Sequence, residues 1–286
     1  MKSKPAIDLT DRKFELIELI AALQPVKKEQ LDLIENEIET TVKTWHQPYA
    51  EYASEGLGIA VLLSPDGGEE NFSYDDCDSP QETELLRKMP VLKETILSLG
   101  LNIMASRLLR LSPGTFLHEH RDYVYLKEVE RYRLHIPVVT NSDAHIITPG
   151  KKIHMERGFL WKLDPKNTIH SACNFGNKPR IHVMLDCYMN DKLAQLLESA
   201  TLSDKLVTDL PRLEAGLFES WVSESRKILH EGNQTEAEEF LLRKFCQFNL
   251  KDKTTFDLIF ALYEEEPDQK ERLSYWKERI REVYPA

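Results

Sequence analysis

The sequence predicts a mixed α and β protein with a β-sandwich or barrel in the middle of the chain and helices on either side. Residues 101–190 contain short strand-like runs separated by turns, which is typical of such β structures. The flanking regions show the 3.6-residue apolar periodicity of helices. With 286 residues, of which 41% are hydrophobic and 30% charged, the chain can bury a sizeable core. We predict an N-terminal domain over 1–192 and an all-helical domain over 193–286.

Three helices and one strand are expected before residue 101. Each helix is indicated by an apolar stripe, such as Leu31, Ile34 and Ile38 in the second one. The run 57–63 is almost entirely apolar and precedes a Pro-Asp-Gly-Gly turn, so we expect a strand there. The acidic stretch 69–82 is expected to form a loop. The expected helices are 9–24, 27–45 and 83–98.

The strands expected in the middle of the chain bring polar residues to one face. Alternation within 131–139 puts Arg131, Arg133 and His135 on the same side. Pro149-Gly150 is expected to turn a hairpin. The expected strands are 106–111, 131–139, 145–147, 152–155, 158–163 and 180–188. The helices expected after them are 191–199, 203–230 with an interruption near Pro211, 235–248, 253–265 and 268–283.

Charge and cysteine usage limit the partners and the compartment. The formal net charge of −11 argues against nucleic acid and anionic membrane surfaces as partners. No apolar run reaches the roughly 18 residues of a membrane span, and the N-terminus has no hydrophobic signal core. The four cysteines show no C-x-x-C spacing, so we expect free thiols and a cytoplasmic protein. The long amphipathic C-terminal helices offer a surface for a homodimer.

Two histidines and an aspartate are spaced as in a non-haem iron(II) site. His120 and Asp122 are two residues apart, so their side chains point the same way on an extended segment. His170 follows fifty residues after His120 and can return on a facing strand. Two imidazoles and one carboxylate bind iron(II) on one face and leave other positions open. Arg180 follows ten residues later, and its planar cation suits the distal carboxylate of 2-oxoglutarate.

His118 competes with Asp122 for a place in this set, since it is also two residues from His120. We prefer Asp122, because a set of three histidines would contain no carboxylate. Arg121 lies between the two ligands and is expected to point away from the metal, so we leave it out of the site. The histidines expected to serve packing or to lie at the surface are His145, His154 and His182.

The same region resembles the aspartyl/asparaginyl β-hydroxylase superfamily, most clearly from residue 90 to residue 190. The closer likeness is to the bacterial branch that hydroxylates free amino acids, which has Pro-His-Ser-Ala where this chain has Ile169-His170-Ser171-Ala172. The segments that carry the likeness are Ser112-Pro113-Gly114-Thr115, the motif at 120–122, the Arg-x-Arg-x-His strand at 131–135, the run 158–164 and the stretch 170–180.

The resemblance implies a double-stranded β-helix, which is the cupin-like jelly-roll, and a chemistry that uses Fe(II), 2-oxoglutarate and O2. Arg180 matches the residue that pairs with the distal carboxylate of 2-oxoglutarate, and His135 matches a histidine near the metal-chelating end of that co-substrate. Arg133, and with it Arg131, matches arginines that face the substrate carboxylate in the peptide-hydroxylating branch. The implied metal ligands are His120, Asp122 and His170.

These observations predict a hydroxylase that acts on an unactivated carbon of a free, proline-like amino acid and releases succinate and CO2. The alternative substrate is an aspartate, asparagine or other residue in a peptide or on a carrier. Asp122 is present where the peptide-hydroxylating enzymes lack it, whereas the two arginines at 131 and 133 exceed the single one of the proline-type enzymes. A third hypothesis is a cupin-like binding protein without enzymatic activity.

Overall fold

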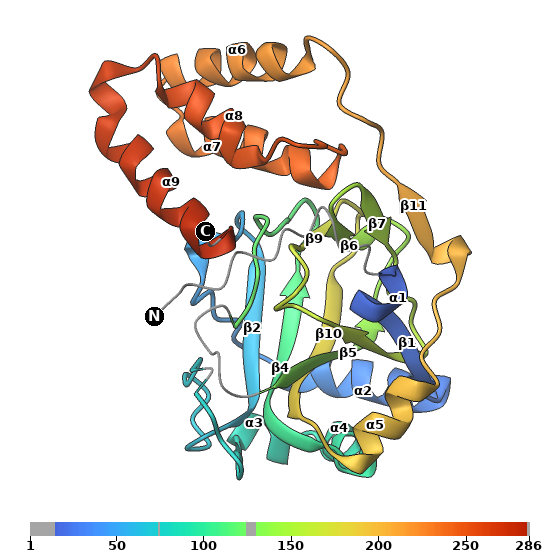
Figure 1. Ribbon diagram of the computed structural model, residues 1–286. Helices are drawn as coiled ribbons and strands as arrows, with labels where there is room; N and C mark the ends of the chain where they lie inside the picture. Colours follow the sequence, from blue (N-terminus) through green and yellow to red (C-terminus); the bar gives the residue numbers. More distant parts are fainter. Residues whose placement is uncertain (1–14, 74, 124–129, 285–286) are drawn as a thin grey trace, which may run out of the picture.

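The computed structural model describes residues 15–73, 75–123 and 130–284 as two antiparallel sheets with helices around them (Figure 1). All pairings between the named strands are antiparallel. The large sheet contains, in spatial order, β1 (Ile20–Pro25), β8 (Phe159–Leu163), β5 (Arg131–Val139), β10 (Arg180–Tyr188), β4 (Asn102–Leu111), β2 (Leu57–Ser64) and β3 (Gln81–Glu82). The small sheet contains β11 (Val207–Asp209), β7 (Lys151–Ile153), β6 (Ala144–Thr148) and β9 (Ser171–Asn174).

Strand β5 shows how the large sheet separates a helix-covered side from a cavity side. Leu134, Ile136 and Val138 are buried in the core that the helices cover. Arg133 and His135 point to the opposite side and line a cavity. Because side chains alternate across a strand, the polar residues of β5 face the space between the sheets, as the pattern within 131–139 predicts.

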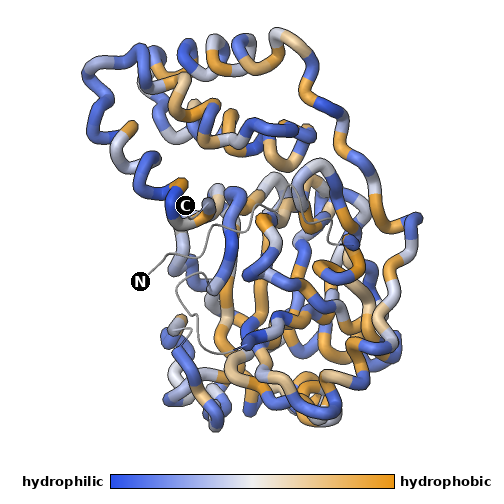
Figure 2. The backbone as a smooth tube through the Cα atoms, viewed as in Figure 1, coloured by the Kyte–Doolittle hydropathy of each residue, from blue (hydrophilic) through white to orange (hydrophobic). Residues whose placement is uncertain are grey.

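Four helices cover the outer face of the large sheet (Figure 1). In α2, the stripe of Leu31, Ile34 and Ile38 is fully or nearly fully buried, as its 3.6-residue spacing predicts. Figure 2 shows the contrast between the mostly apolar strands and helices in which polar and apolar residues alternate. The four helices are α2 (Lys28–Thr41), α3 (Glu84–Arg87), α4 (Pro90–Ser98) and α5 (Asp191–Glu198).

The C-terminal helices build a second apolar core, which also takes in Phe116 and Ile169 from the β region. Figure 1 shows these helices beyond one end of the sheets, with α9 running back toward β2. They are α6 (Leu217–His230), α7 (Gln234–Leu242), α8 (Thr255–Tyr263) and α9 (Lys270–Val283). The short 3-10 turns of the chain are η1 (Ala50–Tyr52), η2 (Asp204–Leu206), η3 (Arg243–Cys246) and η4 (Pro267–Gln269).

The helix expected at 9–24 is wrong from residue 20 on. Residues 1–14 lie outside the described residues, and α1 (Leu16–Leu19) forms a single turn before the chain enters β1. Ile20 pairs with Leu163 of β8, and the run from 20 to 23 is buried throughout. A short, continuously apolar run fits a buried strand as well as a helix, so periodicity alone could not decide between them.

The helix expected at 203–230 is wrong in its first half. Residues 207–209 form β11, which pairs with β7 and extends the small sheet. The β-branched Val207 and Thr208 favour a strand, and Pro211 after them cannot donate a backbone hydrogen bond. The helix itself begins only after Gly216, whose φ of +84° suits a residue without a side chain.

The segment after the last long strand stays attached to the β region. Helix α5 packs into the core of the large sheet, and Thr201 exchanges backbone hydrogen bonds of 2.8 Å with Ala22. The domain boundary at residue 192 stays a prediction. The four cysteines are free thiols, as expected. Within the described parts of the chain, no helix combines the length and apolar character needed to cross a bilayer.

Candidate metal centre

The backbone itself brings the two histidines of the predicted triad together. His120 and His170 face each other in an isolated antiparallel bridge, in which each N–H donates to the other's carbonyl over 2.9 Å. Directly opposed residues of such a pair project their side chains to the same face. The two imidazole rings therefore lie with centroids 4.3 Å apart. The fifty-residue gap between them is closed by this pairing.

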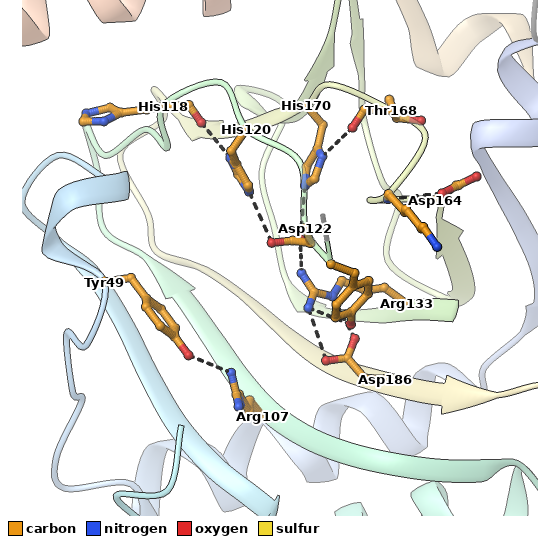
Figure 3. A network of polar contacts seen from close by, with 12 residues as sticks. Tyr49, Arg107, His118, His120, Asp122, Arg133, Asp164, Thr168, His170 and Asp186 are labelled. Carbon is orange, nitrogen blue, oxygen red and sulfur yellow. Dashed lines mark hydrogen bonds and ion pairs between the residues drawn. The ribbon is translucent and has the colours of Figure 1, made fainter. Parts of the chain in front are cut away.

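Asp122 completes the group. One of its carboxylate oxygens lies 4.0 Å from Nε2 of His120, and the other lies 3.6 Å from Nε2 of His170. Candidate ligand atoms of the three residues all lie within 4.8 Å of one another. Figure 3 shows His120, His170 and Asp122 converging, while His118 points away from them. The His118 ring packs near Phe116 and Trp276, at centroid distances of 5.9 and 6.3 Å.

Both imidazoles are held in the tautomer that a metal requires. Nδ1 of His120 donates to the carbonyl of His118 at 2.7 Å, and Nδ1 of His170 donates to the carbonyl of Thr168 at 3.0 Å (Figure 3). A proton on Nδ1 leaves the lone pair of Nε2 directed at Asp122. Burial, helped by the nearby His120, lowers the pKa of His170 to about 3, so its ring is neutral at physiological pH.

Arg133 joins Asp122 to a second, fully buried carboxylate. Its Nε donates to Asp186 at 2.8 Å and its Nη2 donates to the same carboxylate at 3.2 Å. Nη1 of Arg133 donates to Asp122, and Nη2 also donates to the Tyr123 hydroxyl at 2.9 Å. Burial alone would raise the pKa of Asp122, but the charge of Arg133 opposes this effect, and the pKa lies below its ordinary value. Asp122 is therefore ionised and oriented.

Arg180 is a buried cation with no carboxylate partner among the described residues. Its side chain lines the cavity, and the residue is 3% exposed. Its Nη2 donates to Nδ1 of His182 at 3.1 Å, and burial lowers the pKa of Arg180 to about 10. His182 is fully buried and supports this arginine. Beside them, both ring nitrogens of His135 are buried without a hydrogen-bond partner.

These residues surround one cavity of about 380 Å³. Its wall includes every residue of the predicted site except Arg131, which instead donates to Asp76 at 2.5 Å. The rest of the wall is mainly apolar, with side chains from both sheets and from α9. Apolar and tyrosine residues in this wall include Tyr49, Tyr52, Leu57, Leu109, Ile146 and Val283.

Sequence reasoning missed several residues of the site. Asp186 shares its face of β10 with Arg180, so strand alternation could have found it. Arg121 lines the cavity although we expected it to point away. Val283 also lines the cavity and comes from the far end of the chain, where nothing in the motif region signals it.

A cavity within an antiparallel β core, with two imidazoles and an ionised carboxylate converging on its wall, defines a candidate mononuclear metal centre. The chain belongs to the aspartyl/asparaginyl beta-hydroxylase family, whose model matches residues 22–190. This confirms the predicted superfamily and makes the chain a member of a family of hydroxylases.

Individual relatives agree with this assignment. The chain is 29% identical over 168 residues to L-proline cis-4-hydroxylase of Rhizobium meliloti (strain 1021), a match that covers 57% of this chain and 59% of that enzyme. The chain thus spans less than two thirds of the length of that relative.

The chain also shows a weak likeness to two solved structures. A 2OG-Fe(II) oxygenase family protein from Burkholderia pseudomallei is 10% identical, with a TM-score of 0.41 over 57% of this chain and 80% of that one. A prolyl-4-hydroxylase from Pseudomonas putida is 10% identical, with a TM-score of 0.40 over 60% of this chain and 92% of that one.

Proposed function

We propose that this chain is an Fe(II)- and 2-oxoglutarate-dependent hydroxylase of a free, proline-like amino acid, which releases succinate and CO2. The observation that carries the proposal is the convergence of His120, Asp122 and His170 on a cavity that also holds Arg180, which has no carboxylate partner among the described residues. The hydroxylase that matches over 168 residues acts on L-proline by its name, which supports a substrate of this kind.

The donor set fits iron(II). His120 and His170 present Nε2 lone pairs, and Asp122 is ionised because the charge of Arg133 lowers its pKa. Two imidazoles and a carboxylate leave other positions of the ion open. When bound, iron(II) with 2-oxoglutarate and O2 supplies the oxidising chemistry that an unactivated C–H bond requires. The protein's own contribution is to hold, orient and enclose the reactants.

Arg180 fits the distal carboxylate of 2-oxoglutarate. A buried guanidinium without an internal counter-ion gains strongly from an incoming carboxylate, with which it can form two parallel hydrogen bonds. His182 fixes one edge of Arg180 through the 3.1 Å hydrogen bond. His135, with two unpartnered ring nitrogens, would then donate to or accept from the chelating end of the co-substrate.

The substrate role predicted for Arg133 and Arg131 stays a prediction. An incoming carboxylate would compete with Asp186 and Asp122 at Arg133, and with Asp76 at Arg131. In the proposed enzyme Arg133 also acts on Asp122, because its charge keeps that carboxylate ionised and turned toward the histidines.

The size and lining of the cavity support a small substrate. Its volume of about 380 Å³ lies at the lower end of the roughly 300–1,000 Å³ usual for ligand pockets. The apolar wall excludes water from a reactive centre and strengthens the charge interactions inside it. We further propose that the two sheets form a double-stranded β-helix, with the helical region after 192 as a second domain.

Two measurements test the proposal. Anaerobic calorimetry should detect 2-oxoglutarate binding to the Fe(II)-loaded protein, and His170→Ala should abolish retention of iron. Succinate formation is then measured with the proteinogenic amino acids and L-pipecolate as candidate substrates, and in parallel with peptides that contain the same residues. Wild-type protein that binds neither iron nor 2-oxoglutarate would exclude the hydroxylase. Turnover of peptides alone would instead support the alternative substrate class.

A further inference from the structure

Helix α9 reaches the cavity from outside the part of the chain that the family model matches. The model ends at residue 190, whereas α9 covers Lys270–Val283. Val283, its last residue, is 4% exposed and lines the cavity together with the proposed metal ligands. Part of the cavity wall therefore comes from a region outside the range that the family model matches.

Three contacts hold α9 against the β region. The guanidinium of Arg279 lies over the Tyr52 ring, 3.5 Å from its centroid, and Tyr52 lines the cavity. The Tyr284 hydroxyl, just after α9, donates to Glu119 at 3.1 Å. Trp276 packs beside His118, at a centroid distance of 6.3 Å. These contacts flank the segment that carries His120, so the position of α9 is coupled to the metal centre.

Glu119 strengthens this attachment from the side of the β region. It is 2% exposed, and its Oε1 accepts hydrogen bonds from the N–H of Thr255 at 2.9 Å and from the hydroxyl of Thr255 at 2.5 Å. Its other oxygen accepts the hydrogen bond from Tyr284. One buried carboxylate thus ties the start of α8 and the end of α9 to the residue next to His120.

Arg121 lies near the same end of the cavity. It lines the cavity, and Tyr284 is near enough to interact with its charge. Its Nε is buried without a hydrogen-bond partner, and the described residues give Arg121 no ion pair. A partly buried guanidinium with unused donors is a site for an anion, because isolated burial of its charge is costly.

The other two arginines that line the cavity already have a partner or a proposed ligand. Arg133 is bound by Asp186 and Asp122, and Arg180 is the proposed partner of 2-oxoglutarate. Among the cavity-lining residues, Arg121 is therefore the cation left for a second carboxylate. A free amino acid carries such a carboxylate, whereas the same residue inside a peptide does not.

We infer that Arg121 binds the α-carboxylate of the substrate and that Val283 of α9 limits the size of its side chain. This inference rests on the proposed function and assigns it two specificity residues. Arg121 selects a free acid over a peptide-bound residue, and Val283 supplies the part of the cavity wall that comes from α9.

The experiment compares five variants with the wild-type enzyme: Arg121→Met, Arg121→Lys, Val283→Ala, Val283→Phe and, as a control, Lys277→Met on the exposed face of α9. For each, calorimetry gives the Kd of 2-oxoglutarate on the Fe(II) protein. Succinate formation gives KM and kcat for the protein amino acids and L-pipecolate, and for their uncharged N-acetyl amides. Circular dichroism confirms that each variant is folded, and Arg121→Lys keeps the charge if Arg121→Met does not fold.

We expect Arg121→Met to raise the KM of the free acid by about 30-fold or more, the usual effect of removing one partner of a buried charge pair. The Kd of 2-oxoglutarate should stay within about twofold, and the lysine variant should recover part of the loss. Val283→Phe should raise KM most for the bulkiest acids, and Val283→Ala should admit them. Lys277→Met should behave as wild type.

Two results would overturn the inference while leaving the proposed function intact. These are an unchanged KM in Arg121→Met and turnover of the amides as efficient as that of the acids. Binding of 2-oxoglutarate without turnover of any free acid would overturn the proposed substrate class and, with it, this inference. Loss of iron and 2-oxoglutarate binding in the wild-type protein is a different result, because it removes the proposed function and this inference together.

Discussion

Glu238 on α7 joins three C-terminal helices through one buried carboxylate. It accepts hydrogen bonds from the Tyr263 hydroxyl on α8 at 2.5 Å and from the Trp276 indole on α9 at 2.9 Å. Arg272 on α9 donates to it through Nε at 2.6 Å and through Nη2 at 2.5 Å. We predict that Glu238→Ala destabilises the protein and loosens α9, so that the cavity loses its C-terminal wall.

The expected loss follows from the donors that would be left without an acceptor. Tyr263 is 1% and Trp276 is 2% exposed, so neither can turn to water. An unsatisfied buried donor costs about 1–3 kcal/mol, which gives about 2–6 kcal/mol for the two. The Arg272 side chain is 32% exposed and can be rehydrated, so its contribution is at most about 1 kcal/mol. The free energy of unfolding should therefore fall by several kcal/mol.

Urea unfolding followed by circular dichroism measures this loss, with Glu265→Ala as the matched control. Glu265 also pairs with an arginine, Arg226, at 2.9 Å, but its side chain is 71% exposed. The control should lose no more than about 1 kcal/mol. Glu238→Gln, which keeps the shape and one acceptor, should fall between them. Equal stability of Glu238→Ala and Glu265→Ala would refute the reasoning.

Three further predictions concern the anchor, the pH dependence and one turn. Arg180→Gln should weaken 2-oxoglutarate binding by about 30-fold or more, measured by anaerobic calorimetry. Arg110→Gln is the control: Arg110 lies on the same sheet beside Trp45, and its loss should leave 2-oxoglutarate binding unchanged. Burial and the charge of Arg180 lower the pKa of His182 well below 6.5, so only the unfolded chain gains this proton as the pH falls. Stability should then drop below pH 6.5 by up to about 1.4 kcal/mol per pH unit, and urea titrations of His182→Gln should show a flatter dependence. Gly56→Ala should lower the free energy of unfolding by about 2 kcal/mol or more, measured by thermal unfolding. The reason is that φ of Gly56 is +107° and the new Cβ would lie 2.3 Å from Oγ1 of Thr115. Gly100→Ala serves as the comparison, because its new Cβ would meet no atom nearer than 3.7 Å.

The sequence predicted the parts of the site that follow from strand geometry. The i and i+2 spacing of His120 and Asp122 put both on one face, and alternation placed Arg133 and His135 on the cavity side of β5. These inferences need only the two-residue period of a strand. Asp186 follows from the same rule applied to β10, where it shares a face with Arg180.

The missed features depend on contacts between distant segments. The run 20–23 became a strand because β8 offered an edge with which to pair, which no local pattern reveals. Arg121 lines the same cavity as its neighbours in sequence, His120 and Asp122, although alternation along an extended segment would turn it to the other face. Val283 enters the site only because the C-terminal helices pack over one end of the sheets. Tertiary placement of this kind lies outside the reach of periodicity.

The separate origins of the two halves of the cavity have an evolutionary consequence. The residues proposed to hold iron and 2-oxoglutarate lie within the family-matched region, whereas Val283 belongs to a helix encoded far downstream. Mutation or recombination in that distal stretch can reshape the substrate end while the residues on which the chemistry depends keep their identity. Lineages that share the same β core can thus acquire different substrate preferences by exchanging or remodelling the last helix.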